Sequence, residues 1–227
     1  DKAEYKYNYD DIGGNTTNNE ILIGGTSYYI EDKRYFRLWS DESSLLSEDY
    51  NVRVDHIDIK EVRDENGNLL SFEPSNEGTG KEYKILDDYS GKINIKVEEV
   101  NLSYTLNNPT KIKFKDPEKN GDYLLNKELT FEGIEDKVKI TGIKKVKNDI
   151  VICFDISNNT SDDRLIYLFN DTSKPSSGMG DRENMIAEIH LDYDELTLYE
   201  KLTGNIRVNI DQLDVLQKGS WEFIIEW

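Results

Sequence analysis

The residues that most often carry acid–base or metal chemistry are few in this sequence, and they lie far apart. His56 and His190 each sit in a strand-like run, with no histidine or cysteine at the spacing of metal ligands. Cys153 is the only cysteine, and its apolar neighbours predict a small buried side chain rather than a reactive thiol. No G-x-S-x-G turn offers a serine nucleophile. We therefore expect no catalytic residues, no enzymatic activity and no cofactor.

Clusters of acidic residues offer the hard oxygen ligands that calcium prefers. Asp192, Asp194 and Glu195, in the segment LDYDE, are one such cluster. They do not follow the twelve-residue calcium loop with its central glycine, and a chain with 46 acidic residues contains such clusters by chance. The same objection applies to a pair of carboxylates for glycoside hydrolysis. We therefore predict no metal site, and a calcium-dependent rise in melting temperature would contradict that prediction.

The overall charge excludes one large class of partner. The chain has 46 acidic and 28 basic residues among 227, which gives a formal net charge of −18. Such a surface repels phosphate backbones and anionic lipid headgroups, so we expect no binding to nucleic acid. The single cysteine also excludes an intramolecular disulfide and a zinc site built from several thiolates.

Alternation of apolar and polar residues with a period of two dominates the chain, and this pattern predicts β-strands. Turn residues separate the strands, and Asn66-Gly67 is the clearest hairpin signal. The segment SDESSLLSEDY predicts one or two helical turns. The strands are expected near 20–30, 35–39, 52–63, 69–72, 83–86, 92–102, 111–114, 128–131, 137–146, 149–156, 165–169, 185–191, 196–199, 205–215 and 221–227. About seven short strands per hundred residues indicate an all-β protein made of β-sandwich domains of the immunoglobulin-like kind.

One pattern occurs twice. The segment DDYSGKINIKVEEVNL at 87–102 and the segment EKLTGNIRVNIDQLDV at 200–215 match in their apolar positions at an offset of 113 residues, with Gly91 aligned to Gly204. Amphipathic strands resemble one another, but this match includes the turn glycine and the last strand of each half. We therefore predict an internal duplication and two tandem domains, 1–115 and 116–227, joined near the polar segment KDPEKNGDY. Gly91 and Gly204 are expected to serve backbone turns rather than a ligand.

Two loops and one stripe of aromatic residues are the candidates for binding. The segments EPSNEGTGKE and NDTSKPSSGMGDRENM are rich in Gly, Ser and Pro, which predicts exposed connections. A contact with a partner through these loops would use the following residues: Pro74, Asn76, Lys174, Pro175, Met179 and Arg182. Tyr5, Tyr7 and Tyr9 share one face of an extended segment, where they either pack against a sheet or stack on sugar rings.

The last strand carries a resemblance to a known family. The segments LTGNIRVNIDQLDVL and KGSWEFIIEW, with VKITGIKKVKNDIVICFDISN before them, resemble the extracellular regions of membrane-anchored anti-sigma-factor-like proteins of low-GC Gram-positive bacteria. The domains of unknown function in those proteins close with a Gly-x-Trp-x-Phe strand, which is matched here by Gly219, Trp221 and Phe223. The similarity covers 137–227 best and reaches the first half through the repeat.

The resemblance implies a localisation and a function. It implies an extracellular or cell-surface region that follows a cytoplasmic segment and a transmembrane helix absent from this chain, which itself has no apolar run of about 20 residues. On this basis we expect a non-enzymatic pair of domains for envelope sensing or for contact with a protein partner at the cell envelope. The alternative is a carbohydrate-binding or adhesive cell-surface module.

Overall fold

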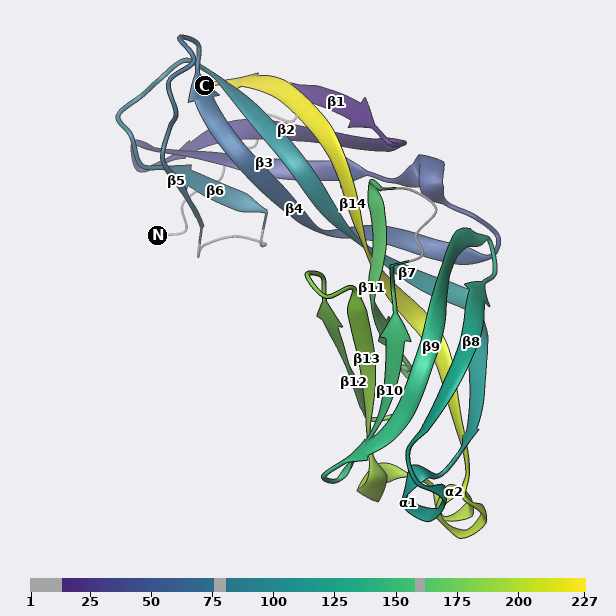
Figure 1. Cartoon of the computed structure of the whole chain (residues 1–227). Helices are drawn as coiled ribbons and strands as arrows, with labels where there is room; N and C mark the ends of the chain where they lie inside the picture. The colour runs from purple at the N-terminus through teal and green to yellow at the C-terminus, as the bar shows by residue number, and fades with distance from the viewer. Residues whose placement is uncertain (1–13, 76–80, 158–161) are drawn as a thin grey trace. The chain divides into compact units, whose positions relative to one another are not determined.

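The described part of the protein consists mainly of antiparallel β-sheet, which confirms the all-β class (Figure 1). The structure is a computed structural model that describes residues 14–75, 81–157 and 162–227. The strands are β1 (Asn15–Asn18), β2 (Ile21–Ile30), β3 (Lys33–Asp41), β4 (Tyr50–Asp64), β5 (Phe72–Pro74), β6 (Glu82–Ile85), β7 (Lys92–Lys115), β8 (Tyr123–Phe131), β9 (Ile134–Val146), β10 (Asp149–Asp155), β11 (Arg164–Asn170), β12 (Ser176–Asp181), β13 (Ile186–Asp192) and β14 (Asn205–Glu226). The short helices are η1 (Ser43–Leu45), α1 (Pro117–Asn120), η2 (Tyr193–Glu195) and α2 (Leu198–Thr203).

The strands form three sheets. Two five-stranded sheets have the orders β1-β2-β3-β6-β5 and β12-β13-β10-β9-β8, and a four-stranded sheet has the order β11-β14-β7-β4. In each five-stranded sheet, consecutive strands such as β2 and β3 are neighbours, whereas immunoglobulin domains place the second and third strands in different sheets. The β-sandwich character is therefore present, and the immunoglobulin-like connectivity finds no support in this strand order. Among the described residues, no helix has the length and apolar character needed to cross a membrane.

The chain divides into two compact units, and each takes segments from several parts of the sequence. Unit 1 contains Asp1–Leu45, Val54–Val100 and Lys218–Trp227, and unit 2 contains Leu46–Arg53 and Asn101–Gln217. The division passes through the long strands β4, β7 and β14, so each unit holds a part of each of these strands. These limits differ from the predicted domains 1–115 and 116–227, and that division stays a prediction.

The core of unit 1 is built around the last strand of the chain. Trp221 of β14 is fully buried, and its indole N–H donates to the Ile21 carbonyl oxygen over 2.9 Å. Gly219 leaves the space that this ring fills, because a Cβ there would lie 2.4 Å from a Trp221 ring carbon. Phe36 and Tyr83 stack nearby at 5.2 Å between ring centroids. The Gly-x-Trp-x-Phe pattern thus serves packing, since Phe223 is also buried.

The core of unit 2 contains stacked phenylalanines and a close approach of two strands. Phe154 of β10 stacks on Phe169 of β11 at 4.6 Å between ring centroids. Gly178 and Gly180 of β12 lie against β11, where a Cβ on Gly180 would stand 2.2 Å from the Tyr167 carbonyl oxygen. Only glycine allows this approach, so the glycine-rich segment that was expected to be a loop contains strand β12.

The order of the strands supports the predicted internal duplication. Strands β1 to β7 correspond in sequence order to β8 to β14: the sheet β1-β2-β3-β6-β5 matches β8-β9-β10-β13-β12, and β4-β7 matches β11-β14. Gly91 and Gly204 occupy equivalent positions before β7 and β14, with φ of 145° and 66°, which agrees with the expected backbone turns. The aligned residues Ile93 and Ile206 are both buried.

Several elements differ from the sequence-based expectation. The segment 196–199 was predicted to be a strand, but it directly follows η2 and contains the start of helix α2. The long strands β7 and β14 continue through segments that were expected to interrupt them, 103–110 and 216–220. The predicted helical turns near Ser43 are confirmed as η1, and the predicted hairpin at Asn66-Gly67 is confirmed by the turn between Asp64 and Asn68.

Candidate functional site

The outward face of the five-stranded sheet in unit 2 carries a row of side chains that crosses all five strands. Cross-strand partners share one face of a sheet. The register pairs Met179 with Glu188, Glu188 with Cys153, Cys153 with Gly142, and Gly142 with Leu124. This row is called the central row below. The opposite face of β12, with Gly178 and Gly180, lies against β11, so the central row points away from the core.

Large apolar side chains are exposed at both ends of this face. Leu124 is 80% exposed at the β8 edge and Met179 is 54% exposed on β12. Ile186, in the next row, is 43% exposed beside its partners Asp181 and Asp155. Single exposed apolar residues are ordinary, but three of them on the same face of one sheet make that face a candidate binding surface.

A polar cluster around Glu188 occupies the middle of the face. The Glu188 carboxylate accepts hydrogen bonds from Lys144 over 3.1 Å and from the Cys153 thiol over 3.5 Å, and it lies 3.0 Å from the His190 Nε2 atom. Burial alone would raise the pKa of Glu188, but the hydrogen bonds from these neighbours hold it below its ordinary value. The other ring nitrogen of His190 lies 3.5 Å from Asp149. These contacts pair the Glu188 carboxylate with the Lys144 ammonium and with His190, so the middle of the face is polar but its opposite charges compensate one another.

The thiol of Cys153 does not have the environment of a nucleophile. Partial burial raises its pKa above the ordinary value, although the ammonium of Lys144 acts in the opposite direction. The expected core position of Cys153 is wrong, because its side chain is half-buried on the outward face. Within residues 14–75, 81–157 and 162–227, no group of three His, Cys, Asp or Glu side chains is placed to hold a metal ion. The cluster can therefore bind and orient a polar group of a partner.

An open depression of about 370 Å³ lies beside Gly142, where the row has no side chain. Its walls are formed by Tyr123, Leu124, Lys144 and Cys153, together with neighbouring residues of β8 and β9. A depression next to an exposed leucine on a sheet can receive one apolar side chain of a partner. The depression is open rather than enclosed, which suits a shallow contact of this kind.

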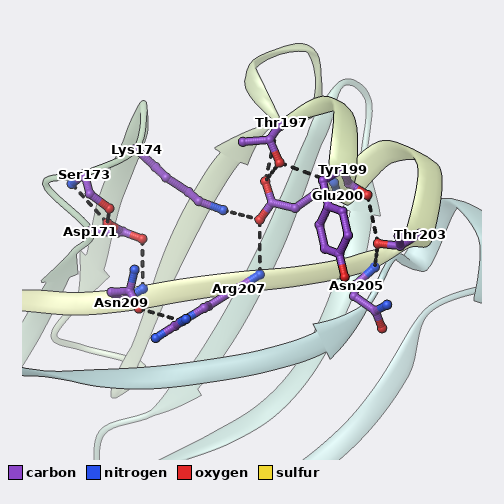
Figure 2. A network of polar contacts seen from close by, with 10 residues as sticks. All are labelled: Asp171, Ser173, Lys174, Thr197, Tyr199, Glu200, Thr203, Asn205, Arg207 and Asn209. Carbon is purple, nitrogen blue, oxygen red and sulfur yellow. Dashed lines mark hydrogen bonds and ion pairs between the residues drawn. The ribbon is translucent and has the colours of Figure 1, made fainter.

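A second exposed surface lies on helix α2, which a buried polar network holds in place (Figure 2). Glu200, on the inner side of the helix, is buried and receives the ammonium of Lys174 from the β11–β12 connection. The same carboxylate accepts from the Thr197 hydroxyl over 2.8 Å and from the Arg207 backbone N–H over 3.2 Å. Thr197 and Glu200 also form a reciprocal capping box at the start of α2.

A second buried carboxylate organises the connection that supplies Lys174. Asp171 is 1% exposed and accepts hydrogen bonds from the Ser173 backbone N–H over 3.0 Å and from the Asn209 backbone N–H over 2.8 Å. The connection between β11 and β12 is thereby tied to β14, and Figure 2 shows both carboxylates directed at the same stretch of that strand. Lys174 therefore reaches Glu200 from a fixed position.

The structure places the predicted contact residues in different settings. Met179 lies in the central row, and Arg182 stacks on the ring of Tyr167 at 4.4 Å while donating to the Asn101 side chain. The Lys174 ammonium forms an ion pair with the buried Glu200 carboxylate. Pro74, at the end of β5 in unit 1, and Pro175 are both exposed and belong to neither surface.

The remaining candidates fall outside the described residues or serve local structure. Asn76 and the tyrosines at 5, 7 and 9 lie outside the described residues, so the carbohydrate-binding alternative stays a prediction. The acidic cluster LDYDE caps η2, because the Asp192 carboxylate accepts the Asp194 backbone N–H over 2.8 Å. The Asn148 side-chain amide donates hydrogen bonds to the carboxylates of Asp192 and Asp194.

The sequence contained a signal for α2 that the expected strand at 196–199 obscured. Thr197 and Glu200 stand at the T-x-x-E spacing of a capping box, which predicts the start of a helix. The exposed apolar residues of α2 and the central row could not be found from the sequence, because alternation does not show which side of a strand remains uncovered. Comparison of the chain with protein-family models, with curated proteins and with solved structures finds no match.

Proposed function

We propose that this protein is a non-enzymatic binding module that recognises a protein partner through the outward face of the unit 2 sheet. The observation that carries the proposal is the central row, in which Leu124 and Met179 remain exposed at opposite ends of a five-stranded face. Strands lie about 4.8 Å apart, so the face is about 20 Å across. Such a face can present an area on the scale of the ~800 Å² that each partner of a specific interface buries.

The polar cluster gives this face specificity. Glu188, Lys144 and His190 are already paired, so a partner that covers them need not leave a charge unpaired. The apolar side chains around them supply the area that drives association. The net charge of −18 favours a partner whose contact surface carries basic residues at its rim.

The cellular setting of this module is proposed from the sequence alone. The resemblance of KGSWEFIIEW to the closing strand of anti-sigma-factor-like ectodomains supports an extracytoplasmic region of a membrane-anchored regulatory protein. The residues that carry this resemblance, Gly219, Trp221 and Phe223, serve packing in this chain, so the proposal concerns the architecture of the protein and assigns no regulatory residue.

Site-specific photo-crosslinking in cells that naturally produce the protein tests this function. A photoreactive phenylalanine analogue at Met179 or at Leu124 should give one discrete adduct of the same mass. The same analogue at Tyr29, which is similarly exposed but lies in unit 1, is the matched control and should give none. Ile186→Asp should weaken the adduct at Met179 without lowering the melting temperature, because Ile186 is partly exposed. Adducts of equal yield at Tyr29, or no adduct at either face position, would contradict the proposal.

A further inference from the structure

The chain contains two Asn-Gly pairs that resemble each other closely in their surroundings. Asn66-Gly67 lies in the turn after β4, and Asn120-Gly121 lies at the end of α1. All four residues are exposed. Both glycines have a positive φ, 84° at Gly67 and 77° at Gly121, and a Cβ atom added to either one would meet nothing within 4 Å. Sequence, exposure and local space therefore do not distinguish the two pairs.

The two asparagine side chains differ in their hydrogen bonds. The Asn120 side-chain amide donates to the Asp116 carbonyl oxygen over 2.8 Å, and Asp116 is itself fully buried. The Asn66 carboxamide has no hydrogen-bond partner within the part of the chain that the structure describes. The backbone N–H of Asn66 donates to the Asp64 carboxylate over 2.9 Å, which fixes the backbone but leaves the side chain unrestrained.

An asparagine followed by glycine undergoes a reaction that consumes water and releases ammonia. The backbone nitrogen of the glycine bonds to the Cγ atom of the asparagine, the bond from Cγ to the amide nitrogen breaks, and ammonia leaves with the proton of the attacking N–H. Water then opens the cyclic imide at one of its two carbonyl carbons, which gives either aspartate or isoaspartate. Glycine favours the attack because it has no Cβ to obstruct it. The reaction needs no oxidant and no cofactor.

The attack has two structural requirements, and the two sites differ in one of them. The glycine N–H must leave its carbonyl partner, and this step is similar at both sites, because Gly67 donates to Asp64 over 3.0 Å and Gly121 donates to Pro117 over 2.7 Å. The carboxamide must also turn toward the next backbone nitrogen, and at position 120 this breaks the additional bond to residue 116. One additional hydrogen bond of ~1.4 kcal/mol lowers the population of the reactive conformation about tenfold.

We propose that Asn66 is a site of spontaneous deamidation in the folded protein and that Asn120 is protected. Either product places a further carboxylate beside Asp64 and Glu65, so the turn after β4 gains one negative charge. Isoaspartate also adds one methylene to the backbone of a tight turn, in which the Asp64 N–H donates to the Asn68 carbonyl over 2.9 Å. The longer backbone weakens this closure. The site lies in unit 1 and is independent of the sheet face proposed above.

Incubation of the full chain in mildly alkaline buffer, followed by peptide mapping with mass spectrometry, tests the inference. The peptide that contains Asn66 should gain the mass that distinguishes a hydroxyl from an amino group, at a rate about tenfold above that of the peptide that contains Asn120. Incubation in guanidinium chloride is the control, because unfolding releases both carboxamides and the two pairs should then react at similar rates. Asn66→Gln should abolish the mass gain in the first peptide and leave the second unchanged, because glutamine would have to form a larger ring.

Anion-exchange chromatography separates the modified protein, since it carries one more negative charge, and this fraction tests the effect on the turn. The Leu70 N–H donates to the Val62 carbonyl over 2.9 Å across the turn, so its amide should exchange faster than in the unmodified protein, while the amides of β10 in unit 2 keep their protection. Equal rates at Asn66 and Asn120 in the folded protein, or a faster rate at Asn120, would overturn the proposal. So would the absence of reaction at Asn66 over the time in which the unfolded chain reacts completely.

Discussion

Glu200 shows how one buried carboxylate positions a surface helix. Burial would raise its pKa, but the hydrogen bonds from Lys174, Thr197 and the Arg207 backbone hold the pKa below the ordinary value. The folded protein therefore binds this proton less readily than the unfolded chain. The stabilisation is fully present above the ordinary pKa of 4.5, and it is lost as the pH falls through the lower folded value.

We predict that Glu200→Gln destabilises the protein by about 2 kcal/mol at pH 7, because Lys174 then faces a neutral amide in a buried setting. The difference in melting temperature between wild type and variant should be largest near pH 7 and should shrink below pH 4.5, since only the wild type carries the titrating group. Thermal unfolding followed by circular dichroism over this pH range measures both effects.

Glu195→Gln is the matched control for this prediction. It removes the same charge from an exposed position on the neighbouring turn η2, and we expect a change within about 0.5 kcal/mol. A stability gap for Glu200→Gln that stays constant from pH 7 to pH 3 would show that the carboxylate does not titrate with the network.

At the scale of elements, the sequence predicted most strands, but strand β12 and helix α2, which depend on tertiary contacts, were not predicted. Alternation located strands such as β9 and β13, because each has one buried and one more exposed face. The sequence of strand β12 predicts a loop, because glycine has a low propensity for strands. Its glycines instead permit the close approach of β12 to β11. Helix α2 was obscured because Leu196, Leu198 and Tyr199 also fit the apolar positions of the repeat.

The approach of β12 to β11 leads to a second prediction. Gly180→Ala should destabilise unit 2 by about 1–3 kcal/mol, because the new Cβ would stand 2.2 Å from the backbone oxygen of Tyr167, which cannot move aside alone. Amide hydrogen exchange should show faster exchange in β12 than in β10. Gly142→Ala is the control, since its Cβ would lie 3.3 Å from the nearest backbone oxygen and cost less. Equal effects of the two substitutions would contradict the close approach.

At the scale of the whole molecule, the duplication and the compact units divide the chain in different ways. The equivalent sets β1–β7 and β8–β14 follow each other in the sequence, and the predicted limit near residue 115 separates them. The compact units instead exchange the ends of the long strands, so Lys218–Trp227 belongs to unit 1 and the second part of β7 belongs to unit 2. Sequence patterns assign residues that are adjacent in the chain to the same domain. They contain no signal for a strand that is divided between two compact units.

The shared strands predict which part of the molecule a core substitution affects. Trp221→Ala removes a fully buried ring and its hydrogen bond to the Ile21 carbonyl, and we expect a loss of about 3–5 kcal/mol. Although residue 221 is in the second half of the sequence, the loss should appear as faster amide exchange in β2, β3 and β6 of unit 1, while β10 and β13 keep their protection. Phe154→Ala is the reciprocal control, because its ring is buried in unit 2, and it should give the opposite pattern. Faster exchange confined to β9, β10 and β13 in the Trp221→Ala variant would instead support domains that follow the sequence, 1–115 and 116–227.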